Sequence, residues 1–341
     1  MPSSFSVHRF TRRDALRLGL GSLCAMPAVG AAAADATEFT GFAGTAVRFA
    51  NVGDAQRVLG ADDDWMQATG DFQRQAVMGA DKAVTMAAFK RWNAEAARPW
   101  ARERRARWIR ALASLAPRFA ALAVPLPKEV LLIHSNGQES ASAPYTRANA
   151  VVLPTNATQE GYSDAELQAH ELFHVVSRYA SALADALYAA VGFEPTPPLA
   201  WPAAWAAIRI ANPDAPNNRH AMRLSANGSS ARVMPVLVAA RTTLNKAAGE
   251  TFFHVMDVRL LEVEPAADGR SMQAVQRDGQ PAWQPLQASR EYLTRLGGNT
   301  GYVIHPEEAL ADNFAFLCSG RSVRNPDLLK RIESILRERG R

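Results

Sequence analysis

The sequence predicts an α+β fold, mostly helical, with a small mixed sheet beside one capped helix. Three observations support this class. Residues 63–122 are rich in alanine and place their apolar residues at helical spacing. Two short apolar runs, at residues 129–134 and 148–153, have the length and composition of buried strands and end at turn-forming residues. A helix with a clear N-terminal signal then begins at Ser163.

A boundary is expected at two closely spaced prolines. Residues 35–60 look irregular, with short extended pieces such as residues 45–50, and residues 63–122 should form two to four helices. Pro125 and Pro127 end any helix, because proline lacks an amide hydrogen and clashes with the preceding turn. We therefore expect a mainly helical N-terminal region over residues 35–127 and a second region over residues 128–341, which contains the motif described below.

The second region contains one well-marked helix. Ser163 and Glu166 fit a capping box, in which the two side chains each satisfy a free backbone amide. The helix should run to about Tyr179. The other expected elements are two strands, at residues 233–239 and 252–262, and two closing helices, at residues 306–317 and 326–339, each starting with proline.

The first 34 residues have the order of an export signal. Arg12 and Arg13 are followed by Leu16 and Arg17, then by a weakly apolar run and four alanines. This order resembles the twin-arginine signal of bacterial export, although Ala15 stands where phenylalanine is common. The resemblance implies a product that folds before export to the periplasm or the medium. An amphipathic N-terminal helix that stays attached is the alternative.

Composition and charge narrow the possible partners. With 48% apolar and 21% charged residues, the chain has an ordinary globular composition. The formal charge is +5, but the first 34 residues hold four arginines and one acid, and the remainder is too weakly basic for a nucleic-acid-binding protein. The basic cluster at residues 102–107 is interpreted as the solvated face of a helix. No later run reaches the roughly 18 apolar residues of a membrane span, so we expect no integral membrane segment after signal removal.

The central observation is the segment His170-Glu171-Leu172-Phe173-His174, which matches the pattern H-E-x-x-H. Residues four apart share one helical face, so both imidazoles can bind one tetrahedral zinc ion. Glu171 lies about 100° around the helix and can accept a proton from a water on the metal. Chance gives on the order of 0.01 such matches in a chain of this composition. The alternative is a buried helix with two incidental histidines, but buried ionisable groups are costly unless they are paired or bind metal.

A catalytic zinc needs a third protein ligand, and the best candidate lies far downstream. Ser177 and Ala180 occupy the positions where a compact pattern would require glycine and a third histidine. A later helix instead places Glu308 and Asp312 four apart on one face. Glu307 is the alternative ligand.

These two segments resemble the gluzincin class of zincin metallopeptidases, in which a later helix supplies a glutamate in a Glu-x-x-x-Asp pattern. The resemblance implies a zincin-like fold, Zn²⁺ as cofactor, and His170, His174 and Glu308 as metal ligands. It also implies that Asp312 bonds a metal-bound histidine, expected to be His170. The strand at residues 148–153 is placed like the zincin edge strand that pairs with an extended peptide. The long separation between His174 and Glu308 departs from the usual spacing of the class.

Further site residues are less well marked. Oxyanion stabilisation needs a donor beside the metal, and Tyr302 and His305 precede the ligand helix as candidates for that catalytic role. Ordinary loop or capping roles are the alternative for both. His134, His220 and His254 are isolated in the sequence and are interpreted as structural.

Three functions follow from this constellation. The leading one is an exported zinc-dependent hydrolase, a metallopeptidase that cleaves a peptide or protein substrate with Glu171 as general base. The second is a zincin-fold protein that binds zinc without turnover. The third is a zinc amidase that acts on cell-wall material. The sequence does not determine the substrate or the oligomeric state.

Overall fold

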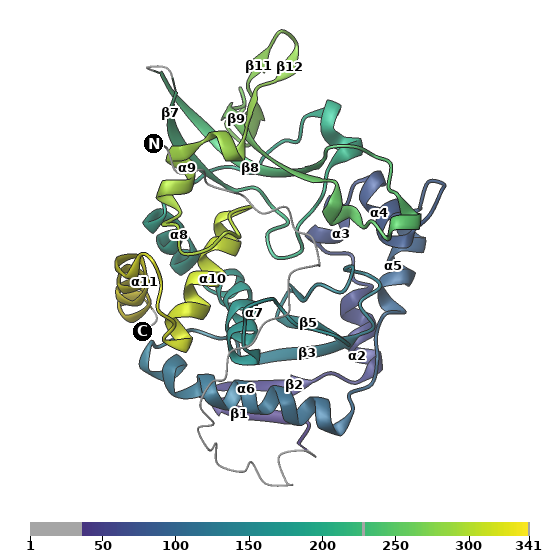
Figure 1. The fold of residues 1–341 in the computed structure, drawn as a ribbon, viewed down its shortest axis with the longest axis vertical. Coiled ribbons are helices and arrows are strands. Elements are labelled where there is room, and N and C mark those ends of the chain that lie inside the picture. Colours follow the sequence, from purple (N-terminus) through teal and green to yellow (C-terminus); the bar gives the residue numbers. More distant parts are fainter. Residues whose placement is uncertain (1–35, 227–228, 340–341) are drawn as a thin grey trace.

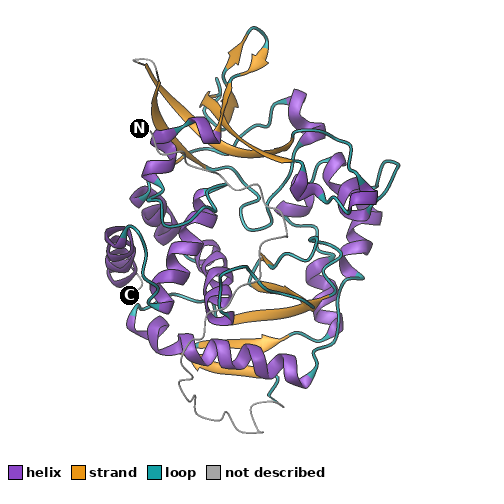
Figure 2. Cartoon of the chain, viewed as in Figure 1, coloured by secondary structure: helices purple, strands orange, loops and turns teal. Residues whose placement is uncertain are grey.

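The computed structural model describes residues 36–226 and 229–339. The predicted export signal at residues 1–34 lies outside the described residues. Two separate sheets stand at opposite ends of the molecule, and most of the helices lie between them or along their sides (Figures 1 and 2). The expectation of one small sheet therefore understates the strand content.

The first sheet is mixed and has the strand order β1-β2-β3-β5-β4. Its central pairs, β2–β3 and β3–β5, are parallel, whereas β1 and β4 add antiparallel at the two edges. The strands predicted at residues 129–134 and 148–153 are confirmed as β3 and β5. The five strands are β1 (Glu38–Phe42), β2 (Thr45–Phe49), β3 (Glu129–Ser135), β4 (Tyr145–Arg147) and β5 (Ala150–Pro154).

The expected boundary at residue 127 does not separate two units. β2 and β3 pair in parallel across it, and a parallel pair requires a long crossover connection. The helices between them form that crossover, so Pro125 and Pro127 end a helix rather than a domain. The crossover contains α2 (Val52–Leu59), α3 (Asp64–Ala68), α4 (Asp71–Met78), α5 (Met86–Ala94) and α6 (Arg102–Ala121). The last four lie in residues 63–122 and confirm the two to four helices expected there, whereas α2 lies in the preceding segment that was expected to be irregular.

The long helix α6 joins the sheet to the centre of the molecule. It packs against β1 and α7 and buries Trp108 and Leu112 in the main core. Its basic start is not simply a solvated face. Arg107 donates to Asp164 at 2.6 and 2.7 Å, and Arg104 donates to the backbone oxygen of Thr155. These arginines therefore fasten α6 to the segment that leads into α7.

The motif lies on α7, and three later helices, α8, α10 and α11, pack against that helix or against one another. The capping box predicted at Ser163 is confirmed at the start of α7, and the predicted closing helices are confirmed as α10 and α11. α10 packs along α7 and contacts α6, α8 and α11. The bounds are α7 (Asp164–Tyr179), α8 (Ser181–Ala190), α10 (Pro306–Ser319) and α11 (Pro326–Arg339).

The second sheet is antiparallel, with the order β10-β9-β8-β7-β6 and β13 also paired with β9. The strands predicted at residues 233–239 and 252–262 are confirmed as β8 and β9, with the second shifted toward the C-terminus. The sequence prediction missed β7, which follows a proline-rich segment. The strands are β6 (Phe193–Pro195), β7 (His220–Ala226), β8 (Ser229–Ala239), β9 (Met256–Pro265), β10 (Met272–Ala274) and β13 (Trp283–Pro285).

The remaining elements are short. A two-stranded ribbon, β11 (Gln276–Arg277) with β12 (Gln280–Pro281), projects from the second sheet (Figure 1). One further α-helix, α9 (Arg290–Arg295), precedes the segment that leads to α10. Among residues 36–226 and 229–339, no helix is long and apolar enough to cross a membrane. The 3₁₀ helices are η1 (Ala203–Ile208), η2 (Lys246–Ala248), η3 (Phe252–His254) and η4 (Leu286–Ala288).

Candidate metal centre

Helix α7 presents both imidazoles in the interior of the protein. The helix is buried from Glu166 to Ser177, and His170 and His174 are 3% and 0% exposed. One helical turn separates them, so their rings meet edge to face with centroids 4.8 Å apart. The two rings can therefore contribute nitrogens to one point in space.

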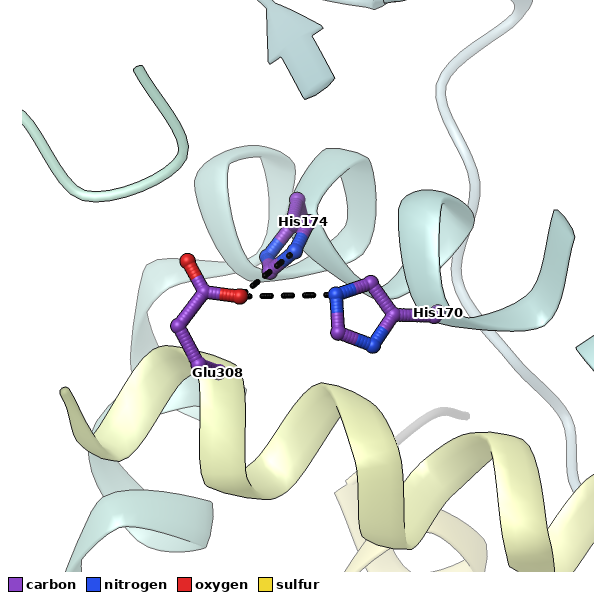
Figure 3. A group of neighbouring side chains, drawn as sticks. All are labelled: His170, His174 and Glu308. Carbon is purple, nitrogen blue, oxygen red and sulfur yellow. Dashed lines mark ion pairs between the residues drawn. The ribbon is translucent and has the colours of Figure 1, made fainter. Parts of the chain in front are cut away.

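Helix α10 brings Glu308 to that point. Its Oε2 lies 3.4 Å from Nε2 of His170 and 3.6 Å from Nε2 of His174 (Figure 3). These separations are long for charge-assisted hydrogen bonds, which fall near 2.7–2.9 Å. Ligand atoms at about 2.05 Å from a tetrahedral zinc stand about 3.3 Å from one another. Both distances from Glu308 therefore match the spacing of ligands around a shared ion, and all three ligand atoms lie within 4.8 Å of one another.

Each imidazole is held by its own carboxylate on α10. Nδ1 of His170 donates to Asp312 at 2.7 Å, and Nδ1 of His174 donates to Glu307 at 2.8 Å. With each Nδ1 committed to a carboxylate, Nε2 of each ring is directed at Glu308 and can coordinate a metal ion that displaces its proton. Glu307, the alternative ligand by sequence, is therefore a partner of His174 and lies on the other side of the ring.

These two carboxylates are themselves fixed. Ser177 and Tyr188 donate their hydroxyls to Glu307, and Thr300 donates its hydroxyl to Asp312. Hydrogen bonds of this kind orient a ligand ring before any ion arrives. Sequence reasoning missed Tyr188, because it lies on α8 and reaches Glu307 only through the packing of three helices.

Two buried atoms of the site have no hydrogen-bond partner among the described residues. They are Nε2 of His174 and Oε2 of Glu171. Leaving a buried polar atom unpaired costs about 1–3 kcal/mol, so such atoms usually point to a missing ion or water. The set of two imidazole nitrogens and one carboxylate oxygen, all within 4.8 Å of one another, fits zinc.

The metal-free site concentrates pKa shifts at the same groups. Burial lowers the pKa of His174, but the carboxylates of Asp214 and Glu308 outweigh burial and raise it to about 9. Burial opposes the charged form of Glu308, yet the two imidazoles lower its pKa to about 2. Burial, reinforced by Asp214, raises the pKa of Glu171 to about 8. The cluster therefore favours positive charge between the imidazoles and Glu308.

The two candidate oxyanion donors have different positions. The ring of Tyr302 stacks on His170, with centroids 6.1 Å apart and planes 17° apart, and its pKa is raised well above the ordinary value by burial and by Glu308. His305 instead caps α10, where its Nδ1 accepts from the amide of Glu307 at 3.1 Å. Burial lowers the pKa of His305 to about 4, so the ring is neutral. His305 therefore has the capping role that was the alternative in the sequence, and because the cap uses only Nδ1, a catalytic role for the ring stays a prediction.

Two residues of the site had no signal in the sequence. Asn212 donates to Oε1 of Glu308, and Asp214 has a carboxylate oxygen within 4.8 Å of ligand atoms of Glu171 and His174. Both lie in a proline-rich segment between the sheets, which local patterning could not connect to α7. In the structure an Asx-type hydrogen bond of 3.0 Å, from the amide of Asp214 to the side chain of Asn212, fixes the turn at these residues.

Searches against protein-family models, curated proteins and solved structures find no significant match for this chain. The site geometry is therefore the basis for the function proposed below.

The edge strand expected from the zincin resemblance is not at the edge. β5 lies between β3 and β4, so its backbone groups are used inside the sheet. The outer strand is β4, which precedes β5 in sequence and folds back antiparallel beside it. A short hairpin partner of this kind carries too few residues to be recognised from periodicity.

The other three histidines of the described residues lie outside the cluster. His134 bonds the backbone oxygen of Pro99 and the hydroxyl of Thr155, and His220 pairs with Asp185 at 2.7 Å. His254 accepts from the amide of Thr251 within a short helix. Each ring therefore has a local structural partner.

Proposed function

We propose that this chain is a zinc-dependent hydrolase of the gluzincin type, and that it acts as an exported metallopeptidase. The observation that carries the proposal is the approach of Glu308 Oε2 to Nε2 of His170 and of His174, at 3.4 and 3.6 Å. Export is supported by the order of residues in the first 34 positions. Cleavage of amide bonds is supported by Glu171, the motif glutamate, which lies buried beside the same cluster.

The protein's own groups suit amide hydrolysis. Zinc held by His170, His174 and Glu308 would supply Lewis acidity to the reaction. Glu171 takes a proton from the attacking water and passes it to the amine that leaves. The hydroxyl of Tyr302 donates a hydrogen bond to the carbonyl oxygen as negative charge develops there.

Positioning groups complete this arrangement. Asn212 donates to Oε1 of Glu308, which leaves Oε2 facing the imidazoles. Asp312 and Glu307 hold the two rings with their Nδ1 hydrogens committed. The reacting groups therefore need little rearrangement when a substrate binds.

The Glu171→Gln variant tests this proposal. It should retain one zinc per chain and lose at least about 1,000-fold in kcat on a fluorogenic peptide, because the general base is removed while the ligands remain. Zinc content by elemental analysis and peptide turnover are measured on the same preparation. Lys330→Gln, an exposed change on α11, is the control for handling and loading. A wild type that holds zinc and cleaves no peptide would support the alternative of a non-catalytic zinc-binding protein.

A further inference from the structure

Residues 211–214 form a fixed wall on one side of the metal centre. Trp65 and Gln73 donate to the backbone oxygen of Ala211 at 3.1 and 3.0 Å, and Arg178 donates to the backbone oxygens of Pro213 and Asp214 at 3.0 and 3.2 Å. Asn212 at the same time donates to Glu308. Since α3, α4, α7 and α10 all hold this segment, it is part of the site and not a displaceable cover.

The wall closes the outer edge of β4. Asp214 Oδ1 accepts from the amide and the hydroxyl of Thr146 at 2.8 and 2.6 Å, and Arg178 donates to the backbone oxygen of Thr146 at 3.5 Å. The next outward-facing positions of the strand are two residues from Thr146 on either side. There Pro144 has no amide hydrogen, and the backbone oxygen of Ala148 accepts from Arg178 at 3.3 Å. A long extended peptide therefore finds no free strand edge to pair with here, in contrast to β-strand addition. A peptide whose first residue binds against the wall does not need to pair with a strand edge.

Asp214, in the wall, adds to the negative charge of the carboxylates on α7 and α10. The buried cluster combines the carboxylates of Glu171, Asp214, Glu307, Glu308 and Asp312. With Glu171 in the ionised form in which it acts as base, one divalent ion and the Arg178 guanidinium, 3.7 Å from Asp214 Oδ1, neutralise three of the five. A second ion cannot use His174, because Nδ1 of that ring is bonded to Glu307 and Nε2 is taken by the first ion. The remaining charge favours a cationic group on the substrate.

A mainly apolar pocket opens on the same wall. Asp214 and Tyr302 contribute to its lining, and its other walls include Trp65, Phe253 and Met256. Its empty volume of roughly 590 Å³ includes open solvent at the mouth, so the apolar lining rather than the size indicates which side chain it accepts. Phe253 is 43% exposed, one of the few large apolar side chains on the described surface that are open to solvent. The pocket therefore favours a bulky apolar side chain next to the metal centre.

From these features we propose that the enzyme removes the first residue of peptides with a free amino terminus, preferring a large apolar one. The inference rests on the proposed hydrolase function. The terminal ammonium binds Asp214, and the first side chain enters the pocket. In an amino-terminal residue the nitrogen lies two bonds, about 2.5 Å, from the carbonyl carbon that is attacked. Because Glu171 acts on the water that attacks this carbon, the carboxylate that binds the ammonium must lie beside Glu171. Water adds to that carbonyl, and the released amine takes the proton from Glu171.

Glu139 is the competing anchor for the ammonium. It lines the same pocket, is 1% exposed, and has one carboxylate oxygen without a hydrogen-bond partner among the described residues. It does not share the close grouping that joins Asp214 to Glu171 and His174. The ammonium of a residue undergoing cleavage is therefore assigned to Asp214.

The first experiment compares the zinc-loaded protein on leucine p-nitroanilide and on N-acetyl-leucine p-nitroanilide. The free amine should be cleaved with a kcat/KM at least about 10- to 100-fold higher, the value of a hydrogen bond to a buried charge. In Asp214→Asn that ratio should fall toward one, with most of the change in KM. Glu139→Gln and the exposed Asp327→Asn should keep the ratio of the wild type. Equal cleavage of the two anilides by the wild type, or a ratio lost in Glu139→Gln but kept in Asp214→Asn, overturns the assignment.

The second experiment is a binding measurement that separates this inference from the proposed function. Calorimetry with zinc-loaded Glu171→Gln should give a dissociation constant for leucyl-leucine at least about 10-fold lower than for its N-acetyl form. If the wild type cleaves internal peptide bonds but binds the two dipeptides equally, the proposed function stands and this inference fails. If the wild type cleaves nothing but the free amine binds more tightly, the recognition by Asp214 stands and the hydrolase proposal fails. Zinc content and the thermal midpoint of every variant show that it is folded.

Discussion

The two helices that build the metal centre, α7 and α10, are equally buried but carry opposite chemistry. α7 supplies two imidazoles, and α10 supplies the carboxylates of Glu307, Glu308 and Asp312. Each of these carboxylates meets an imidazole of α7 rather than a group on its own helix. Isolated buried charges are costly, and here each helix compensates the other. The site therefore belongs to the pair of helices, and changes on the two sides test different parts of it.

The largest effect is expected where a ligand is removed from either helix. His174→Ala on α7 and Glu308→Ala on α10 should each abolish stoichiometric zinc at micromolar metal, because a tetrahedral site loses one of its three protein ligands. Zinc per chain is measured by elemental analysis after dialysis. An unchanged zinc content in Glu308→Ala would place the third ligand elsewhere and contradict the claim that α7 and α10 together supply the ligands.

A smaller effect is expected for the carboxylates that hold the rings. Glu307→Gln and Asp312→Asn should each weaken zinc binding about 10- to 100-fold, since they no longer orient and polarise His174 and His170. Competition with a fluorescent chelator gives the dissociation constants. If only one of the two variants loses affinity, the two imidazoles are not supported in equivalent ways. Asp164→Asn is the matched control on α7, because Asp164 lies at the start of that helix, pairs with Arg107 and is outside the cluster.

The pH dependence should differ between the metal-free and zinc-loaded protein. The folded-state pKa of His174 is raised from 6.5 to about 9 in the metal-free chain. A raised histidine pKa contributes stability that is fully present below about 6.5 and is lost as pH rises toward 9. The thermal midpoint with chelator should therefore fall across this window, while zinc, which displaces the proton, stabilises more strongly as pH rises. A zinc-induced rise in thermal midpoint that shrinks from pH 6.5 to pH 8.5 would contradict this linkage.

The smallest effect concerns the helix itself. Ser163 caps α7 by accepting from the amide of Glu166, and Ser163→Ala should lower the free energy of unfolding by about 1 kcal/mol. Zinc affinity should stay within about twofold, because the cap lies nearly two turns from His170 and leaves the tertiary contacts of the ligands in place. Urea denaturation with and without chelator measures both quantities. A large loss of zinc affinity in this variant would mean that α7 alone, rather than its pairing with α10, sets the site.

The contrast between the helices also explains what the sequence could predict. α7 has local signals, since Ser163, Glu166 and the motif all act within a few residues of one another. Glu308 and Asp312 were predicted from their spacing on one helical face together with the resemblance to gluzincins. Glu307 could not be assigned to His174 in this way, because its role depends on the rotation of α10 against α7.

Other features could not be predicted because they exist only in three dimensions. Asn212 and Asp214 reach the site through a proline-rich segment with no periodicity, fixed by contacts from four helices. His305 was placed in the active site by its position before the ligand helix, where a cap and an oxyanion donor have the same sequence position. β4 was missed because its pairing with β5 depends on a short hairpin rather than on residue type.

The most direct test of the central claim is a crystal structure of the zinc-loaded protein with anomalous scattering at the zinc edge. The expected result is one ion about 2.0–2.2 Å from Nε2 of His170, Nε2 of His174 and a carboxylate oxygen of Glu308, with Asp312 and Glu307 still bonded to the two rings. An ion bound elsewhere, or one held by the imidazoles with Glu308 outside its coordination sphere, would contradict the account.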